Sequence, residues 1–419
     1  MEKQEALLAG TLLRTERLRQ GMEQKAVCYG LCVPSYLCKI EQGTVCPDPA
    51  LLSALFRRLG IEYTQDAGLL KTLRQALLDY FYRLEYGLNP QEVYASLQAQ
   101  EEVLRHSPLA ICWLLVQGCH GEAVLPLLEK LERAMTSRQL ALYRLLRCRA
   151  QPQAPEALTW CREACQSLDC SAAMMELAFL YLLRGDYAAI HRMESRLVAA
   201  AVDEGNLFQL ANYFFLNATA YACLNQEAMM LTYYQRCIRL LQNTGWQQFL
   251  GDTYYNMGAT YISLKQYDLS LEYLARAEKI QGVSLALSHK KAVALLRSGQ
   301  REEARAALRQ MQALLDSEDA TESDHLKYQE ACMELEENYL DNPAYLELLE
   351  RLIRALKQEC HFGHLYFYRE AVLDAYVRQR KYKKALAFEE EISLFVAKKR
   401  RLSRSTPLQF LTKMGFMPA

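Results

Sequence analysis

The sequence predicts an all-α protein, with a small helical head at the N-terminus followed by a long array of helices. Three observations lead to this fold class. The 419 residues contain only 18 Gly and 11 Pro, and 51% of them are hydrophobic, a composition that favours long helices over a turn-rich β protein or a disordered chain. No segment after residue 66 has the pattern of a strand. Small and aromatic residues also recur at a fixed period, as repeat arrays require.

The sequence of the first 64 residues predicts five short helices separated by tight turns. Four of the five helices have clear ends. Glycines end the helices, and Pro34 and Pro49 stand at first-turn positions, with Asp48 as an N-cap. The first helix carries Leu7 to Leu18 and stops at Gln20–Gly21, and the others cover Gln24–Tyr29, Pro34–Ile40 and Asp48–Gly60. The turn at Gly30–Val33 between two short helices has the geometry of a helix-turn-helix.

The run from Gln24 to Gly43, followed by Pro47 and Leu51–Leu59, resembles the XRE (lambda-repressor-like) DNA-binding domain. The resemblance covers roughly residues 5–62, and its most specific part is Tyr36-Leu37-x-Lys39-Ile40-Glu41-x-Gly43, which matches the end of the recognition helix. It implies a helix-turn-helix domain over residues 1–64 that binds double-stranded operator DNA.

Two residues depart from the pattern of that family. Val33 stands where a capping Ser is usual, which should weaken the start of the third helix by about 1 kcal/mol. Cys38 replaces a common Ser.

The third helix is the candidate reader of the major groove, because such helices place their first turns at base edges. Ser35 and Tyr36 occupy those positions, and Lys39 follows one turn later. Gln24 corresponds to a family position that contacts the DNA backbone or the neighbouring helix. The eight Lys/Arg and seven Asp/Glu of residues 1–64 give a net charge of only +1. One head should therefore bind weakly, and we expect a homodimer.

Residues 65–405 read as a helical repeat array, and the repeats are clearest over residues 205–316. The spacings match the tetratricopeptide (TPR) pattern, in which small residues let two helices approach and aromatics fill the gap between pairs. The best copy is Gly258, Tyr261, Tyr267, Ser270, Leu274 and Ala277. One further copy contains Ala292 and Leu295, and another contains Ala218 and Tyr221. A weaker copy contains Ala178, Tyr181, Tyr187 and Leu197. A second weaker copy contains Leu373, Tyr376, Tyr382, Ala385 and Ile392. The sequence thus predicts a right-handed TPR-type α-solenoid.

A helix-turn-helix head joined to a TPR array resembles the RRNPP regulators (Rap, Rgg, NprR, PlcR and PrgX proteins) of Gram-positive bacteria. The resemblance implies a quorum-sensing transcription regulator, in which the concave face of the array binds a short signalling peptide and controls a DNA-binding dimer. The alternative is a TPR module that binds a protein partner, with the head only as a tether. The Rap branch contains phosphatases that lack a DNA-binding head.

The register of the repeats gives the positions on the inner face of the array. Amides beside apolar residues suit an extended peptide, because an Asn side chain both donates to and accepts from a peptide backbone. The predicted peptide-binding residues are Asn212, Asp252, Tyr255, Asn256, His289, Lys290 and Arg297, with Phe215, Leu216, Thr219, Ala259, Ile262 and Val293 beside them. Family members use inner-helix Asn in this way, and Asn256 and Asn212 are the matching positions.

The 14 cysteines are expected to be reduced and mostly part of the core, because no secretory signal precedes them. Neither the four head cysteines nor Cys360-His361-x-x-His364 has a convincing metal spacing, although a thiol switch in the head stays open. The longest uncharged run, Gly205–Gln226, holds too many amides for a membrane span. We therefore expect a cytoplasmic protein with no cofactor, metal, membrane partner or catalytic site.

The 49 Lys/Arg and 49 Asp/Glu of the chain cancel, so the chain as a whole is not an electrostatic nucleic-acid wrapper. Basic residues gather in 378–404, which we interpret as a solvated last helix in preference to a nucleic-acid site. The apolar tail, residues 406–419, is expected to cap the last repeat.

Overall fold

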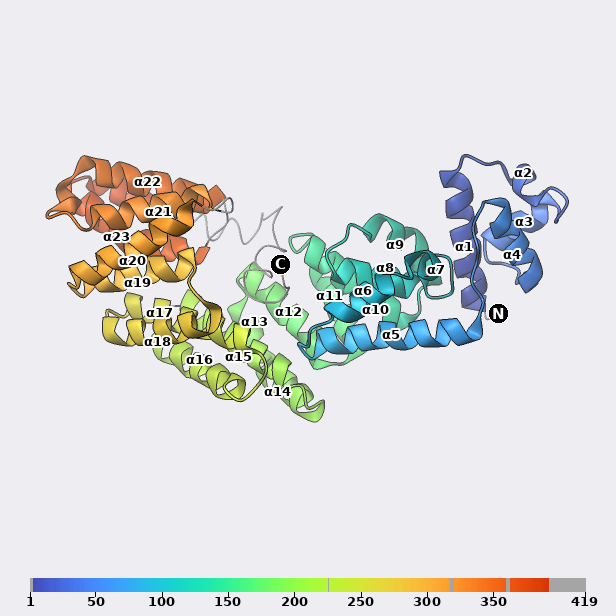
Figure 1. Cartoon of the computed structure of the whole chain (residues 1–419), viewed down its shortest axis with the longest axis horizontal. Helices are drawn as coiled ribbons and strands as arrows, with labels where there is room; N and C mark the ends of the chain where they lie inside the picture. The colour runs from blue at the N-terminus through green and yellow to red at the C-terminus, as the bar shows by residue number, and fades with distance from the viewer. Residues whose placement is uncertain (1–2, 225, 317–319, 359–361, 392–419) are drawn as a thin grey trace. The chain divides into compact units, whose positions relative to one another are not determined.

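The computed structural model describes residues 3–224, 226–316, 320–358 and 362–391, and these residues form helices joined by short turns, without a strand (Figure 1). The chain divides into two compact units, and the boundary along the chain falls between Tyr213 and Phe214, within helix α15 (Leu207–Cys223). Each unit is described by itself. The all-α prediction is confirmed.

The first unit begins with a head of four helices, where the sequence predicted five. The head helices are α1 (Lys3–Arg19), α2 (Gln24–Cys28), α3 (Pro34–Glu41) and α4 (Pro49–Arg58). Residues 59–66 form no further helix, and the next helix begins only after Asp66, whose side chain accepts hydrogen bonds from Gly68 N and Leu69 N. The predicted cap on α4 is confirmed, because the Asp48 side chain accepts from Ala50 N at 2.8 Å.

The rest of this unit is a succession of helices that pack on their neighbours. They are α5 (Ala67–Glu85), α6 (Gln91–Gln98), α7 (Glu101–Arg105), α8 (Ala110–Cys119), α9 (Leu125–Leu131), η1 (Glu132–Ala134), α10 (Ser137–Ala150), α11 (Ala157–Leu168), α12 (Ser171–Arg184), α13 (Tyr187–Arg192) and α14 (Glu194–Asp203). The long helix α5 packs on α6 and α8 (Figure 1). The weak repeat expected at Ala178, Tyr181, Tyr187 and Leu197 contains a break at Met193, between α13 and α14.

Within the head, α1 and α3 approach each other at backbone distance. A Cβ added to Gly10 of α1 would lie 1.9 Å from the carbonyl oxygen of Ile40, so only glycine fits there. Leu13, Leu37 and Phe56 are completely buried between the helices. The same apolar cluster continues into Leu114 of α8 and Leu128 of α9. The head is therefore built onto the first helices of the array through a shared core.

The second unit consists of antiparallel helix pairs. They are α16 (Glu227–Leu241), α17 (Gln247–Ser263), α18 (Tyr267–Gln281), α19 (Leu285–Arg297), α20 (Arg301–Leu315), α21 (Glu322–Met333), η2 (Tyr339–Asp341), α22 (Pro343–Gln358) and α23 (Phe362–Arg378), and residues 382–391 are also helical. A Cβ on Gly258 of α17 would lie 2.7 Å from Leu274 Cγ of α18. Ala218 and Ala292, at the matching repeat positions, are completely buried. The small residues of the repeat pattern therefore lie at helix–helix contacts, as predicted.

Two repeats of this unit share a tyrosine–tyrosine contact that the sequence search did not single out. Tyr221 lies 5.3 Å from Tyr233, and Tyr261 lies 5.5 Å from Tyr273, measured between ring centroids. In each pair an arginine lies over the second ring: Arg236 over Tyr233 at 4.8 Å and Arg276 over Tyr273 at 5.1 Å. The repeat thus extends to the cation–π contacts on the second helix of each pair.

Several sequence predictions fall outside the described residues, among them the interpretation of Cys360 and His361 as no metal site. Others are the capping tail 406–419, the repeat position Ile392, and the part of the basic segment 378–404 beyond residue 391.

Candidate functional site

The candidate DNA-reading face is the exposed side of α3. Ser35 and Lys39 are exposed, whereas Tyr36 is half-buried and packs against the core of the head. Ser35 and Lys39 are therefore free of any packing role, and Tyr36 has a structural role in addition to the predicted one.

Gln24 contacts the neighbouring helix, which is one of the two roles that its family position implies. Its Nε2 donates to Glu41 Oε2 at 2.8 Å. Glu41 also accepts from Arg17 of α1, through Nε at 2.6 Å and Nη2 at 3.0 Å, and both partners are buried. The hydrogen bond to Glu41 raises the pKa of Arg17. The Glu of the recognition-helix motif thus fixes α3 to α1 and is not available to DNA.

The surface of the head is as nearly balanced in charge as its net charge of +1 suggests. The buried Arg17–Glu41 pair contributes nothing to the surface, and Glu16 forms an ion pair with Arg19 at 2.7 Å. The other basic residues of residues 3–64 are all exposed, namely Lys3, Arg14, Lys25, Lys39, Arg57 and Arg58, and so are the acidic Glu23, Asp48 and Glu62. Each ion pair cancels, so the net charge counted from the sequence also holds for the surface of the head.

The inner side of α17 presents a row of half-buried polar residues, Asp252, Tyr255 and Asn256. Asn256 Nδ2 donates to the backbone oxygen of Asp252, one turn earlier, at 2.8 Å. Asp252 Oδ1 accepts from Gln281 Nε2 at 2.5 Å, while Oδ2 is buried without a partner among the described residues. Burial raises the pKa of Asp252 to about 6, and burial also raises the pKa of Tyr255. These residues offer the Asn256 Oδ1 acceptor and one unpaired carboxylate oxygen of Asp252.

The inner side of α19 is covered by α23. His289 and Lys290 are only 1% and 3% exposed. His289 Nε2 lies 2.7 Å from the hydroxyl of Tyr368, and Lys290 Nζ lies 3.1 Å from the ring centroid of Phe367. The sequence predicted that His289 and Lys290 lie in an open groove, and the structure instead buries both side chains. The reason is that α23, far along the chain, packs its aromatic residues against this helix.

Burial has a strong electrostatic effect on these two side chains. Burial lowers the pKa of His289 and of Lys290 well below their ordinary values, and the positive charges of Lys327 and Arg297 lower both further. Arg297, the third predicted residue of α19, lies with its Cζ 5.3 Å from the centroid of Phe367. His289, Lys290 and Arg297, all predicted to bind the peptide, therefore surround the ring of Phe367 on α23.

A buried acidic pair, Glu330 of α21 and its C-cap residue Glu334, belongs to the same interior and was missed by sequence reasoning. Glu330 Oε1 accepts from the Tyr345 hydroxyl at 2.9 Å, and Glu334 accepts from the same hydroxyl at 3.4 Å. Burial and the neighbouring Glu334 raise the pKa of Glu330 well above its ordinary value. Nothing in the local sequence distinguishes these two glutamates from surface ones, because they are buried by helices distant in sequence, α22 among them.

Asn212 lies in the first unit, on α15, and is 2% exposed. Neither its Nδ2 nor its Oδ1 has a hydrogen-bond partner among the described residues. An unpaired buried amide costs about 1–3 kcal/mol, so this side chain has unused capacity for a ligand or an ordered water. Of the residues predicted beside it, Phe215 and Leu216 are buried, and Thr219 donates to its own helix at Phe215 O.

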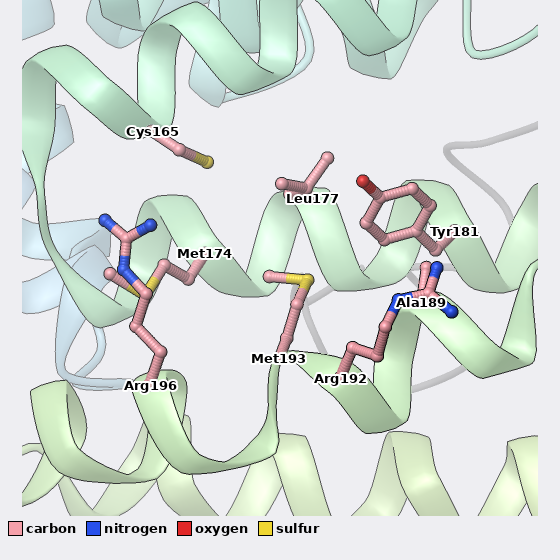
Figure 2. A pocket seen from close by; sticks show the side chains of 8 residues that line it. All are labelled: Cys165, Met174, Leu177, Tyr181, Ala189, Arg192, Met193 and Arg196. Carbon is pink, nitrogen blue, oxygen red and sulfur yellow. The ribbon is translucent and has the colours of Figure 1, made fainter.

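A separate cavity of about 180 Å³ lies in the first unit, and none of the predicted site residues lines it. Figure 2 shows that Met174 and Met193 face this space from α12 and the α13–α14 break, with Arg192 and Arg196 nearby. Arg196 forms an ion pair with Asp169 at 2.9 Å. The lining is mainly apolar, and no buried charged group points into it.

No known family model matches the sequence, and no curated protein shows significant similarity to it. Among solved structures, a Rap protein complexed with the competence and sporulation factor is similar, with a TM-score of 0.57 and 12% identity over 78% of this chain and 99% of that chain. The apo quorum sensor NprR from B. thuringiensis gives 0.57 and 15% over 78% and 99%. The apo form of RapI gives 0.55 and 12% over 79% and 98%.

At these identities the similarity concerns the fold. The fold of the described residues is that of an all-helical, TPR-like α-solenoid, as the sequence predicted. None of the described helices has the length and apolarity needed to cross a bilayer.

Proposed function

We propose that the chain is a transcription regulator that binds operator DNA through α3 and a short signalling peptide through the inner side of its helical array. The observation that carries the proposal is the likeness to a peptide-complexed Rap protein and to the quorum sensor NprR over more than three quarters of the chain. The head adds the helix-turn-helix geometry, with Ser35 and Lys39 exposed on α3.

The peptide contacts are assigned to α17 in preference to α19. Asp252, Tyr255 and Asn256 are accessible in part, whereas His289 and Lys290 are covered by α23. The Asn256 Oδ1 atom is the acceptor for a peptide N–H, because its Nδ2 is already bonded within the helix. Asn212 is 2% exposed, as buried as His289 and Lys290, so no peptide contact is assigned to it.

The peptide is found by incubating the purified chain with cellular peptides and reading the bound ones by mass spectrometry. Calorimetric titration of that peptide into wild type and Asn256→Ala then measures the contact. We expect affinity to fall about tenfold, since one hydrogen bond is lost, while stability barely changes. Asp268→Asn, an exposed change on α18, is the control. Capture of a protein partner with no peptide would support the tether alternative instead.

The DNA-binding half of the proposal is tested by mobility shift on duplexes selected from a random pool. Ser35→Ala with Lys39→Ala should abolish specific binding and leave the fold intact, because both side chains are exposed. Binding should also weaken steeply with salt, since phosphate contacts release counterions.

We also propose a homodimer, because a single small head makes few phosphate contacts, and two heads on a two-half-site operator supply the missing affinity. Light scattering at micromolar concentration, with and without the selected duplex, measures this. A monomer under both conditions would contradict it.

A further inference from the structure

The cavity of the first unit takes no part in the DNA and peptide contacts proposed above. Its volume is about 180 Å³, and its lining comes from α11, α12, α13 and α14. Protein interiors contain few voids larger than a water molecule. An engineered apolar cavity of about 150 Å³ binds benzene, so the space in this unit is large enough for one aromatic ring.

The cavity lies beside an interruption in the helical repeat. Gly185 ends α12 in the left-handed conformation, at φ 71°, and the Asp186 side chain then caps α13 by accepting from Ala189 N at 3.0 Å. Helix α13 is only six residues long, and Met193 lies in the turn before α14. The second helices of later pairs, α16, α18 and α20, are each continuous over 15 residues. Side chains from both parts of the divided helix line the cavity.

The wall of the cavity suits an apolar ligand. Met174, Leu177 and Ala189 are buried and line it, and Figure 2 shows Leu177 and Met193 pointing toward the same space. Methionine thioethers are polarisable and adapt to ligands of different shape. The Cys165 thiol already donates to Ala173 O at 3.0 Å. A ligand in this space must be mostly apolar, because its polar groups would find few partners there.

The rim of the cavity is cationic. Arg192 and Arg196 line it and are exposed (Figure 2). Arg162 adds a third guanidinium, whose Nη2 donates to the Tyr181 hydroxyl at 3.1 Å. Because that hydroxyl accepts from Arg162, its own proton can be donated to an anion. The ion pair of Arg196 with Asp169 is exposed at both ends, so an anionic ligand can compete with it.

We propose that this cavity binds a small apolar monocarboxylate, with a body of about six to nine carbons inside and the carboxylate at Arg192 and Arg196. The volume and the wall select the apolar body, and the rim selects the negative charge. A hydrophilic anion would leave the apolar wall unused, and a neutral hydrocarbon would leave the two guanidinium groups unused. The site is separate from the peptide contacts assigned to α17, which belongs to the second unit.

Phenylacetate is the probe, because it joins one ring to one carboxylate. It is titrated into the full-length chain carrying ¹³C at the methionine methyl groups, and the resonances of Met174 and Met193 are identified by their loss in Met174→Leu and Met193→Leu. We expect saturable shifts of both resonances, with a dissociation constant on the order of 1 mM. Phenylacetamide, which lacks the charge, should bind about three- to fivefold more weakly. Acetate, which lacks the ring, should shift neither resonance.

Two kinds of variant test the cavity and its rim separately. Ala189→Leu places a larger side chain in the cavity and should weaken phenylacetate binding at least about tenfold, while cavity filling keeps or raises the melting temperature. Arg192→Gln with Arg196→Gln should lower the affinity for phenylacetate about three- to fivefold and leave that for phenylacetamide unchanged. Both arginines are exposed, so this variant keeps the fold even where Ala189→Leu does not. Arg133→Gln, at an exposed arginine of η1, should bind as wild type does.

Each outcome supports or overturns the proposal. Shifts at Met174 and Met193 that require the ring, weaken without the charge and disappear in Ala189→Leu support it. No saturable shift, or shifts confined to other methionines, would overturn it. Equal affinities for the acid and the amide, or for wild type and the double arginine variant, would also overturn it. The measurement involves neither peptide nor DNA, so its failure leaves the proposed function standing.

Discussion

Helices α17 and α19 are the first helices of neighbouring repeats, and the sequence assigned both to the same peptide-binding face. In the structure they differ. The polar residues of α17 remain partly accessible, and one carboxylate oxygen of Asp252 has no partner among the described residues. The corresponding residues of α19 lie beneath Phe367 and Tyr368 of α23. Repeat register therefore predicts equivalent positions on neighbouring helices, and contacts with distant helices such as α23 decide which of those positions stay accessible.

The largest expected effect comes from removing the cover of α19. Tyr368 is completely buried, and its hydroxyl bonds His289. Tyr368→Ala should lower the free energy of unfolding by about 3–5 kcal/mol, the cost of deleting a buried aromatic side chain. Urea unfolding measures this. Tyr382→Ala, at a 60% exposed tyrosine, is the control and should change stability little. Equal effects would mean that α23 does not pack on α19.

The next effect concerns the helix contact that positions α17. Gly258→Val places a branched side chain where a Cβ alone would lie 2.7 Å from Leu274 Cγ and 3.1 Å from the backbone oxygen of Ser270. We expect a loss of about 2–3 kcal/mol in urea unfolding, because the backbone oxygen cannot move aside. Gly245→Ala, where no atom lies within 4 Å of the added Cβ, should be close to neutral. A harmless Gly258→Val would contradict the close approach.

A third prediction tests the burial of Lys290 on α19 through the pH dependence of stability. Lys290→Met should raise stability at pH 7 by about 1–3 kcal/mol, because the folded protein disfavours the charged lysine. The folded pKa lies below the unfolded value of 10.5, so wild type gains stability as pH rises towards 10.5. The advantage of the variant should therefore shrink between pH 7 and pH 9.5 in urea titrations.

The control for Lys290 is its neighbour in the chain. Lys291 is paired with Glu278 at 2.8 Å and is only partly buried. Lys291→Met should lose at most about 1 kcal/mol at either pH. If the two variants behave alike, the burial of Lys290 under α23 is wrong.

The smallest expected effect is at Asp252 on the open face. Its folded pKa of about 6 lies above its ordinary value of 3.8, so ionisation destabilises the folded state. Wild type loses this stability as pH rises from about 4 through 6. Asp252→Asn should therefore be more stable at pH 8 by about 1–2 kcal/mol and show no gain below pH 4. Thermal unfolding at the two pH values tests this, and a gain that persists at pH 3.5 would contradict it.

The difference between the two helices also shows how far sequence reasoning reached. The pattern at Gly258, Ala292 and Ala218 placed the small residues at helix contacts, because close packing of helices tolerates nothing larger. The inner-face prediction for Asp252 and Asn256 followed from the same register. The prediction for His289 and Lys290 used the same rule, but it did not foresee that α23 buries both side chains. The cover is a contact between α19 and α23, more than seventy residues apart, which no local period encodes.

In the head, the sequence by itself determined the four helices with clear ends, the glycine turns, the cap at Asp48 and the missing cap at Val33. These depend on the backbone preferences of residues within one turn of each other. Only the tertiary structure decided that Glu41 accepts hydrogen bonds from Arg17 and Gln24. The tertiary structure also decided that the head shares its core with α8 and α9, and that α23 covers α19. The physical reason is that burial, pairing and pKa depend on which distant helices meet, and those contacts are set by packing of the whole chain.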